Sequence, residues 1–192
     1  ANIKVFATGG VGGVHLDAEK TFDISADLQE LAQTPVTVIS AGPKAILDLP
    51  KTLQFLETLG VPVVTFGQDE LPAFWSRSSG LRSPIRMNSA EEIARSQLIR
   101  EALSIPGGQL IANPIPVYAE IPLKKILPII NKAHLEAKKE KISDKNLTPF
   151  LLDKIFHLTE GASLKANIEL VKNNAFLACK IASSLITEKS KI

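Results

Sequence analysis

The stretch Val36-Thr-Val-Ile-Ser-Ala-Gly-Pro-Lys-Ala-Ile-Leu-Asp48 decides the fold of this chain. Its first half is an apolar, β-branched run that predicts a buried strand over Val36–Ser40, and the Gly-Pro pair ends that strand before a helical pattern resumes. A strand followed directly by a helix is the unit from which parallel α/β sheets are built. The turn also places Lys44 at the rim of the predicted sheet, where a partly desolvated amine can attack a carbonyl.

The same alternation of strand and helix continues along the chain. Further apolar runs that end near Gly, Asn or Pro predict buried strands over Ile3–Ala7, Val61–Thr65 and Gln109–Ala112. The helical patterns cover Asp27–Gln33, Lys44–Leu59, Ser89–Ser104, Leu123–Lys141, Phe150–Thr159 and Leu164–Thr187. Capping residues support two of them, Ser89 with Glu92 as a capping box and Thr148-Pro149 as an N-cap and first-turn proline. We therefore predict an α/β fold with a largely parallel central sheet and C-terminal helices.

Between the third strand and the helix at Ser89, the segment Gly67–Met87 has no clear periodicity and is predicted to be a long loop. A loop of this length inside a compact domain is often functional. Periodicity does not decide whether Phe74 and Trp75 are core residues or lie at a subunit contact.

The composition fits one globular domain over residues 1–192. The chain is 45% hydrophobic and 22% charged, which is enough to bury a sizeable core. Its 22 Lys and Arg residues against 20 Asp and Glu residues give a net charge of +2, and the bases are scattered except for Lys138-Lys139-Glu140-Lys141. We assign that run to a solvated helix face. Nucleic acid is therefore not an expected partner.

The single cysteine, Cys179, lies in an apolar helical stretch, and we interpret it as a small core residue rather than a reactive thiol. One cysteine allows no disulfide within the chain, which favours a reducing compartment. No apolar run in residues 1–192 reaches the roughly 18 residues of a membrane span, and these residues show no secretory h-region. We predict a cytoplasmic protein with no membrane partner.

Glycines and a histidine follow the first predicted strand. Gly9-Gly-Val-Gly-Gly13 permits close backbone approach, either as a cradle for a phosphate or sugar or simply as a tight turn. His15 directly follows and is better placed for chemistry than the helical His134 and His157, which we take as surface or packing residues. No histidine spacing supports a zinc site.

Carboxylates and amides provide further candidates. Asp23 and Asp27 flank Ser25, and such hard oxygen ligands suit Mg²⁺ or Mn²⁺, although Ser25 or Asp27 could equally cap the following helix. The amides of Asn113 and Asn167 could bind a sugar hydroxyl, and Asn113 could instead brace the turn before Pro114.

Five motifs, taken in chain order, closely resemble the pseudouridine-5′-phosphate glycosidase family, also called the indigoidine synthase A-like family. They are Phe6–His15, Thr21–Glu30, Ser40–Lys44, Ala112–Pro116 and Ser163–Asn167. The resemblance implies a three-layer α/β/α fold, a divalent metal that is usually Mn²⁺, and a homotrimer. It also implies reversible cleavage of the C–C glycosidic bond of pseudouridine 5′-phosphate to uracil and ribose 5-phosphate.

Matched motif by motif, the resemblance assigns roles to individual residues. Lys44 falls on the lysine that forms the covalent ribose adduct, and Asp23 on the metal-binding aspartate. His15 and Asn167 fall on active-site positions that we expect to be catalytic. The expected substrate-binding residues are Thr8, Ser25, Ala26 and Asp27.

The resemblance begins part-way into the family's sequence. The general-acid glutamate and a phosphate-binding lysine of the family have no counterpart in residues 1–192, so we expect this chain to be a fragment that lacks its N-terminal part. Two other readings stay open at this point. One is a Schiff-base lyase that uses Lys44 on another phosphosugar, and the other is an inactive sugar-phosphate-binding fragment.

Overall fold

The computed structural model describes residues 2–143 and 146–190. Within these residues a sheet of five parallel strands lies at the centre, in the order β1 (Val5–Ala7), β2 (Thr37–Ser40), β5 (Gln109–Ala112), β3 (Val63–Phe66) and β4 (Ile85–Met87). The prediction of a largely parallel sheet is confirmed. The four predicted strands are all present, and the fifth, β4, lies at the end of the segment that was predicted to be a loop.

Strand β4 escaped the sequence analysis because it is short and exposed. Its three residues include two that are exposed, so they carry no apolar run, and they pair only with β3 at the edge of the sheet. Its strand conformation comes from that pairing and not from a local pattern.

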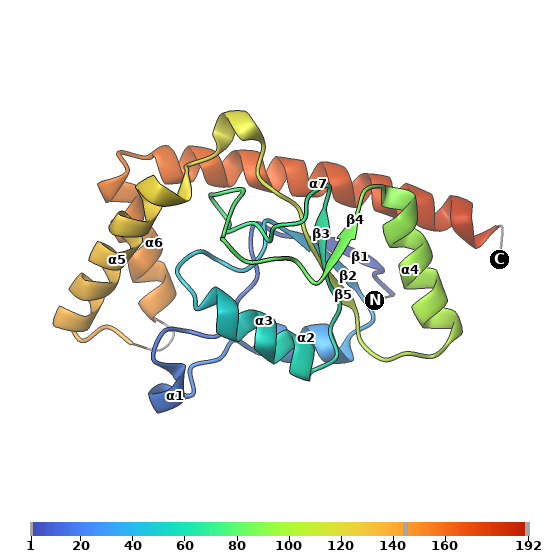
Figure 1. The fold of residues 1–192 in the computed structure, drawn as a ribbon, viewed down its shortest axis with the longest axis horizontal. Coiled ribbons are helices and arrows are strands. Elements are labelled where there is room, and N and C mark those ends of the chain that lie inside the picture. The colour runs from blue at the N-terminus through green and yellow to red at the C-terminus, as the bar shows by residue number, and fades with distance from the viewer. Residues whose placement is uncertain (1, 144–145, 191–192) are drawn as a thin grey trace.

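Helices cover both faces of the sheet, as Figure 1 shows. One face carries α2 (Ala26–Gln33) and α3 (Leu49–Thr58), and the other carries α4 (Ala90–Ala102) and the long α7 (Ala162–Lys189). Two more helices, α5 (Leu123–Lys139) and α6 (Leu147–Leu158), pack on each other at one end of the molecule. The short α1 (Ala18–Thr21) and the 3-10 helix η1 (Val117–Ala119) complete the described elements. The three-layer α/β/α fold is therefore confirmed.

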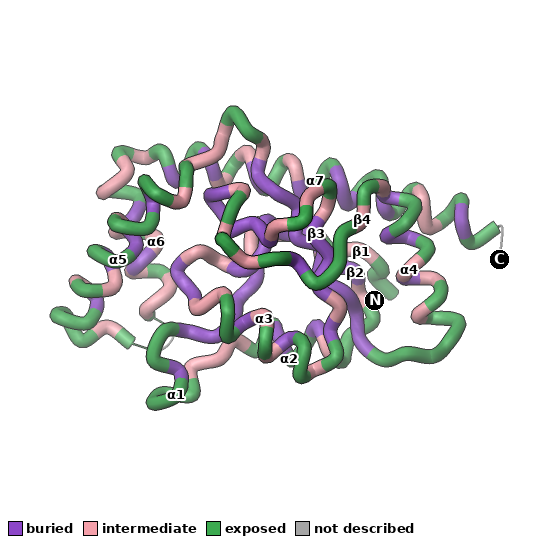
Figure 2. The backbone as a smooth tube through the Cα atoms, in the orientation of Figure 1, coloured by how far each residue is buried: buried purple, intermediate pink, exposed green. Residues whose placement is uncertain are grey.

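The core lies between these layers, and the inner strands β2, β5 and β3 form its most deeply buried part (Figure 2). On one face, Leu28 and Leu31 of α2 pack with Leu110 of β5, whereas Ile39 and Ile111 face α4 and α7 on the other. A third cluster joins α5, α6 and α7. Burial of these side chains is the main force that holds the helices on the sheet.

Two helix starts differ from the predictions. The helix predicted over Lys44–Leu59 begins only at Leu49, because the carboxylate of Asp48 accepts the backbone N–H of Lys51 (3.0 Å) and so caps the helix there. Lys44 consequently lies in a turn before the helix. Helix α6 begins at Leu147, just before the predicted Thr148-Pro149 cap.

Other local predictions can be compared directly. The capping box is confirmed, since the backbone N–H of Glu92 donates to Ser89 Oγ (3.1 Å) and that of Ser89 donates to Glu92 Oε2 (3.3 Å). The core position predicted for Cys179 is wrong, because α7 turns Ala178 and Ile181 inward and leaves Cys179 exposed. Phe74 and Trp75 are both buried in the core of this chain.

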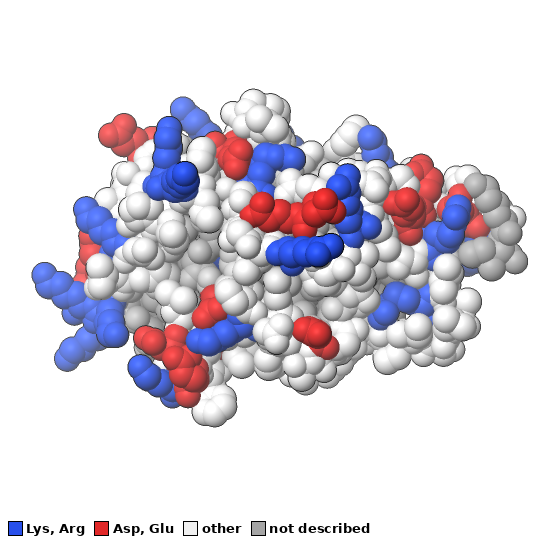
Figure 3. Space-filling view, in the orientation of Figure 1, with Lys and Arg blue, Asp and Glu red and all other residues white. Residues whose placement is uncertain are grey.

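The surface charges are mixed over the face drawn in Figure 3, where basic side chains gather at the end formed by α5 and also lie elsewhere on the face. The lysines at 138, 139 and 141 are exposed, as expected for a solvated helix face. Within the described ranges, none of the helices is both long and apolar enough to cross a bilayer.

The turn after β2 gives a first prediction. Gly42 has φ +88°, and a Cβ at this position would lie 2.8 Å from the carbonyl oxygen of Pro72. Gly42→Ala should lower the free energy of unfolding by about 2–5 kcal/mol, because left-handed strain of about 1–2 kcal/mol adds to the clash. Urea denaturation measures this difference.

Gly60 provides the matched control. It has φ +70° at the end of α3, but no atom lies within 4 Å of the point that a Cβ would occupy, so Gly60→Ala should lose only the strain of about 1–2 kcal/mol. Equal losses for the two variants would contradict the packing argument at Gly42.

Candidate active site

The site begins where β1 and β2 leave the sheet. The two segments that follow these strands stay paired by backbone hydrogen bonds beyond the strand ends. The N–H of Thr8 donates to the carbonyl of Ile39 (3.0 Å), and the N–H of Ala41 donates to the carbonyl of Gly9 (2.8 Å). The pairing continues from Val11 N to Gly42 O (3.2 Å) and from Lys44 N to Val11 O (3.1 Å). The backbone of Lys44 is therefore held by the glycine loop.

The glycines of residues 9–13 serve close packing within the protein. A Cβ on Gly10 would lie 2.6 Å from the ring of Phe74, and one on Gly12 would lie 2.1 Å from Ser25 Oγ. Two N–H groups of the loop are already bonded internally, since Gly12 donates to Asp27 Oδ2 (2.7 Å) and Val11 donates to the carbonyl of Gly42 (3.2 Å). Of the two interpretations of this loop, these contacts favour the tight turn.

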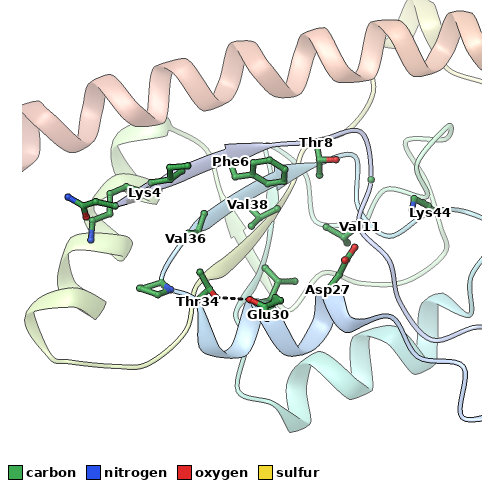
Figure 4. Close-up of a pocket in the computed structure, with 15 residues that line it drawn as sticks. Lys4, Phe6, Thr8, Val11, Asp27, Glu30, Thr34, Val36, Val38 and Lys44 are labelled. Atoms are coloured by element: carbon green, nitrogen blue, oxygen red, sulfur yellow. Dashed lines mark hydrogen bonds between the residues drawn. The ribbon is translucent and has the colours of Figure 1, made fainter. Parts of the chain in front are cut away.

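A pocket of about 720 Å³ opens beside this loop, between the β1 edge and α2 (Figure 4). Lys44, Thr8 and Asp27 lie toward one end of it, and Lys4 lies at the other. Lys44 is half-buried, and within the described residues its Nζ has no hydrogen-bond or ion-pair partner. An amine in this position is free to meet a ligand in the pocket.

His15 and Asp23 form a second part of the site. Nδ1 of the buried His15 lies 3.7 Å from Oδ2 of Asp23, and it has no hydrogen-bond partner among the described residues. Burial lowers the pKa of His15 below 6.5, Asp23 opposes that effect, and the positive charge of Lys44 adds to it. An orphaned imidazole nitrogen beside a carboxylate is a donor pair that suits a divalent cation.

The segment 25–27 begins helix α2 and places its side chains toward the loop. Ser25 is the N-cap, and its Oγ accepts the backbone N–H of Asp27 (3.3 Å). Ala26 is the first helical residue and is exposed. The capping interpretation of Ser25 is thus confirmed, while Asp27 reaches both the glycine loop and the pocket.

Asn167 lies apart from the residues that line this pocket. Its Oδ1 accepts a hydrogen bond from Nε1 of the buried Trp75 (2.7 Å), and Trp75 contacts Phe74 edge-to-face with ring centroids 4.9 Å apart. Phe74 in turn packs on Gly10. Asn167 is therefore linked to the glycine loop through two aromatic residues of the segment 67–87. In the sequence, only its length singled out this segment, because a loop of that length is often functional.

Two further polar residues near the site were not recognised as parts of it. His134 of α5 is half-buried, and its Nε2 bonds the carbonyl of Ile46 (2.9 Å), two residues beyond Lys44. Burial lowers its pKa. Asn174 of α7 is fully buried and bonds the carbonyl of Thr8 (2.8 Å). Helix periodicity alone cannot distinguish such residues from ordinary packing.

Comparison with known proteins places this arrangement in a family. The family described as "Indigoidine synthase A like protein" matches residues 1–184. A pseudouridine-5′-phosphate glycosidase of Paracoccus denitrificans is 62% identical over 187 residues, which cover 97% of this chain and 62% of that protein. One of Legionella pneumophila is 58% identical over 182 residues, which cover 95% and 58%.

Two solved structures have the same fold. The prealnumycin C-glycosynthase AlnA, in complex with ribulose 5-phosphate, has a TM-score of 0.92 and 32% identity, covering 99% of this chain and 63% of that one. An indigoidine synthase A-like protein of Thermotoga maritima has a TM-score of 0.85 and 38% identity, covering 94% and 59%.

The three-layer fold, with a pocket beside its β1 edge, defines this chain as part of an α/β protein. The chain belongs to the indigoidine synthase A-like family. It spans about three fifths of the length of the curated relatives that it matches.

The lowered pKa of His134 predicts a pH dependence of stability. Near its ordinary pKa of 6.5 the unfolded chain takes up a proton that the folded protein does not, so stability is lost as the pH falls below about 6.5. His134→Gln keeps an Nε2–H donor and removes the titration. Urea denaturation from pH 7.5 to about 5.5 should show a shallower loss for this variant.

The comparison uses the slope against pH within each protein, so a constant effect of the glutamine on stability does not disturb it. Parallel slopes for the wild type and His134→Gln would contradict the assignment.

Proposed function

We propose that the protein containing this chain is a pseudouridine-5′-phosphate glycosidase, which reversibly cleaves the C–C glycosidic bond to give uracil and ribose 5-phosphate. The observation that carries the proposal is the unpaired amine of Lys44 in the pocket that Thr8 and Asp27 also line. The names of relatives at 58–62% identity support the choice of substrate.

Lys44 would supply the covalent chemistry. A C-glycoside has no leaving heteroatom to protonate, so its cleavage needs an electron sink at C1′. Nζ of Lys44 attacks C1′, and the C1′–O4′ bond opens with its electron pair and a proton passing to O4′. The nitrogen lone pair then forms an iminium as the C1′–C5 bond breaks, and its electron pair goes to the uracil carbon.

Two further steps complete the balance of atoms. The uracil carbon takes a proton from a general acid, which the family resemblance assigns to a glutamate outside residues 1–192. Water then adds to the iminium and releases ribose 5-phosphate and the free lysine. Thr8, Ser25, Ala26 and Asp27 would contact the substrate, and Asp27 is the member of this set whose carboxylate already orders the glycine loop.

A divalent cation, Mn²⁺ by the resemblance, would be held by Asp23, with His15 beside it. The fit rests on the unpartnered Nδ1 of His15 at 3.7 Å from the Asp23 carboxylate. No group of three or more His, Cys, Asp and Glu side chains gathers within the described ranges, so water would fill most of the coordination sphere. Such an ion supplies positive charge for the anionic substrate.

His15 and Asn167 would act on the bound substrate or on its immediate surroundings. Burial favours the neutral imidazole of His15, which can accept a proton or a cation at Nδ1. Asn167 carries a carbonyl oxygen already bonded to Trp75, so its NH₂ group is the part that would face a ligand. We also propose a cytoplasmic homotrimer.

A second candidate is Schiff-base chemistry on another phosphosugar. The observation that favours it is the close structural match to a C-glycosynthase whose complex contains ribulose 5-phosphate. Lys44 would then form its Schiff base with a phosphosugar other than the ribose of pseudouridine 5′-phosphate. Release of uracil from pseudouridine 5′-phosphate separates this candidate from the glycosidase.

The covalent role of Lys44 predicts a trapped adduct. Borohydride with ribose 5-phosphate should reduce an imine on Lys44, which intact mass and peptide mapping will locate. Lys44→Ala should lose the adduct and lower kcat for uracil release by about 10³-fold or more.

Lys4→Ala is the matched control, because Lys4 lines the opposite end of the same pocket and pairs with Glu101 (3.1 Å). It should keep the adduct. An adduct mapped to another lysine, or one that persists in Lys44→Ala, would refute the role of Lys44.

The cation site predicts a binding defect that does not depend on activity. Asp23→Asn should weaken Mn²⁺ binding by about 10-fold or more, measured by the electron paramagnetic resonance signal of free Mn²⁺, because it removes the anionic ligand. Asp17→Asn is the control, since Asp17 is the exposed N-cap residue of α1 and forms ion pairs with the exposed Lys20 and Lys138. Equal affinities of the two variants would rule out Asp23 as the ligand.

A further inference from the structure

Two buried amides lie directly behind the glycine loop and take no part in the chemistry proposed above. Asn174 of α7 is 0% exposed, and Asn113, the residue after β5, is 4% exposed. Nδ2 of Asn113 donates to Oδ1 of Asn174 (3.1 Å). That bond fixes the orientation of the Asn174 amide, because it assigns the oxygen to Asn113 and turns the NH₂ group toward the loop.

The NH₂ group of Asn174 contacts the backbone just after the end of β1. It donates to the carbonyl of Thr8 (2.8 Å) and lies 3.3 Å from the carbonyl of Gly9. The Gly9 carbonyl also accepts the N–H of Ala41, the second of the bonds that pair the glycine loop with the Lys44 turn. Asn174 therefore sets the geometry at the start of that pairing.

Asn113 connects Asn174, and through it the backbone after β1, to the central strands β2 and β5. Its backbone N–H donates to the carbonyl of Ser40 (2.7 Å), which extends the β2–β5 pairing by one step. The amide pair thus ties the ends of β1, β2 and β5 to helix α7. Of these strand ends, that of β1 leads directly into the pocket at Thr8, and α7 reaches it from the face of the sheet opposite α2.

We propose that Asn174 is a positioning residue for the site: its amide holds the Thr8–Gly9 turn so that the carbonyl of Val11 can hold the backbone N–H of Lys44. The catalytic part of this inference rests on the proposed function. Loss of the donor takes this partner from the part-buried carbonyl of Thr8 and leaves the carbonyl of Gly9 with the N–H of Ala41, so the turn must move for the Thr8 carbonyl to find another donor. A displacement of about 1 Å at a reacting group can cost about 100-fold in rate.

Asn174→Asp tests the inference with almost no change in shape. It keeps an oxygen for Asn113 but replaces the NH₂ donor with an acceptor that faces two carbonyls. Asn173→Asp is the matched control, because Asn173 is the neighbouring residue on α7 and donates in the same way to the carbonyl of Pro114 (3.1 Å), which lies outside the loop. Asn174→Ala is the second variant, which removes the donor without adding a charge.

Two readouts follow, both in the protein as the cell makes it, including any sequence beyond residues 1–192. Hydrogen exchange should be faster by about 10-fold or more in peptides over 8–15 and 40–46, with β3 unchanged. The rate of borohydride trapping at saturating ribose 5-phosphate should fall by about 10-fold or more, with the half-saturating concentration within about threefold. Asn173→Asp should match the wild type in both readouts.

The outcomes separate the inference from the proposed function. Folded Asn174→Asp and Asn174→Ala proteins that exchange and trap like the wild type would overturn the positioning role, and so would exchange that rises equally in every segment. If the wild type forms no adduct on Lys44, the proposed function fails. Selective exchange in the two loop segments would still support the anchoring of the loop by Asn174.

Discussion

The site depends on backbone pairing that continues past the ends of two parallel strands. In most sheets the ladder stops where the strands diverge, but here the glycine loop and the Lys44 turn stay bonded as far as Lys44 N and Val11 O. This constraint accounts for the residues in both segments. Gly10 and Gly12 let Phe74 and Ser25 approach the loop, and Gly42 provides the positive φ that turns the chain toward Lys44.

The pairing needs support from outside the two strands, and distant segments provide it. Phe74 and Trp75 come from the long segment after β3, Asn174 from the last helix, and His134 from α5. Each contributes at least one contact to a backbone carbonyl, a glycine or a side-chain amide. Because these hydrogen bonds are short and partly shielded from solvent, they hold the polar site in place while the apolar clusters hold the layers together.

The electrostatic character of the site follows from the same burial. His15 is desolvated between a carboxylate and a lysine, and desolvation outweighs the attraction of Asp23, so the pKa of His15 is lowered and the neutral imidazole is favoured. The amine of Lys44 has no internal anion to neutralise it within the described residues. The unpaired amine of Lys44 in the pocket suits an anionic ligand, and the orphaned nitrogen of His15 beside Asp23, which lie outside the residues that line the pocket, suits a metal ion.

The sequence by itself determined the α/β class, four of the five strands, the capping box at Ser89, and the family, because strand runs, caps and contiguous motifs are local patterns. It also predicted site roles for Lys44, Thr8 and Asp27, which the fold brings to one pocket, and for His15 and Asp23, which the fold places side by side. The tertiary structure alone decided the edge strand β4, the exposure of Cys179 and the non-helical turn at Lys44. It also decided the contacts of Asn174 and His134, whose partners lie 166 and 88 residues away. The physical reason is that hydrogen-bond satisfaction and burial depend on which segments meet in space, and a periodic pattern specifies a face of a helix but not its partner.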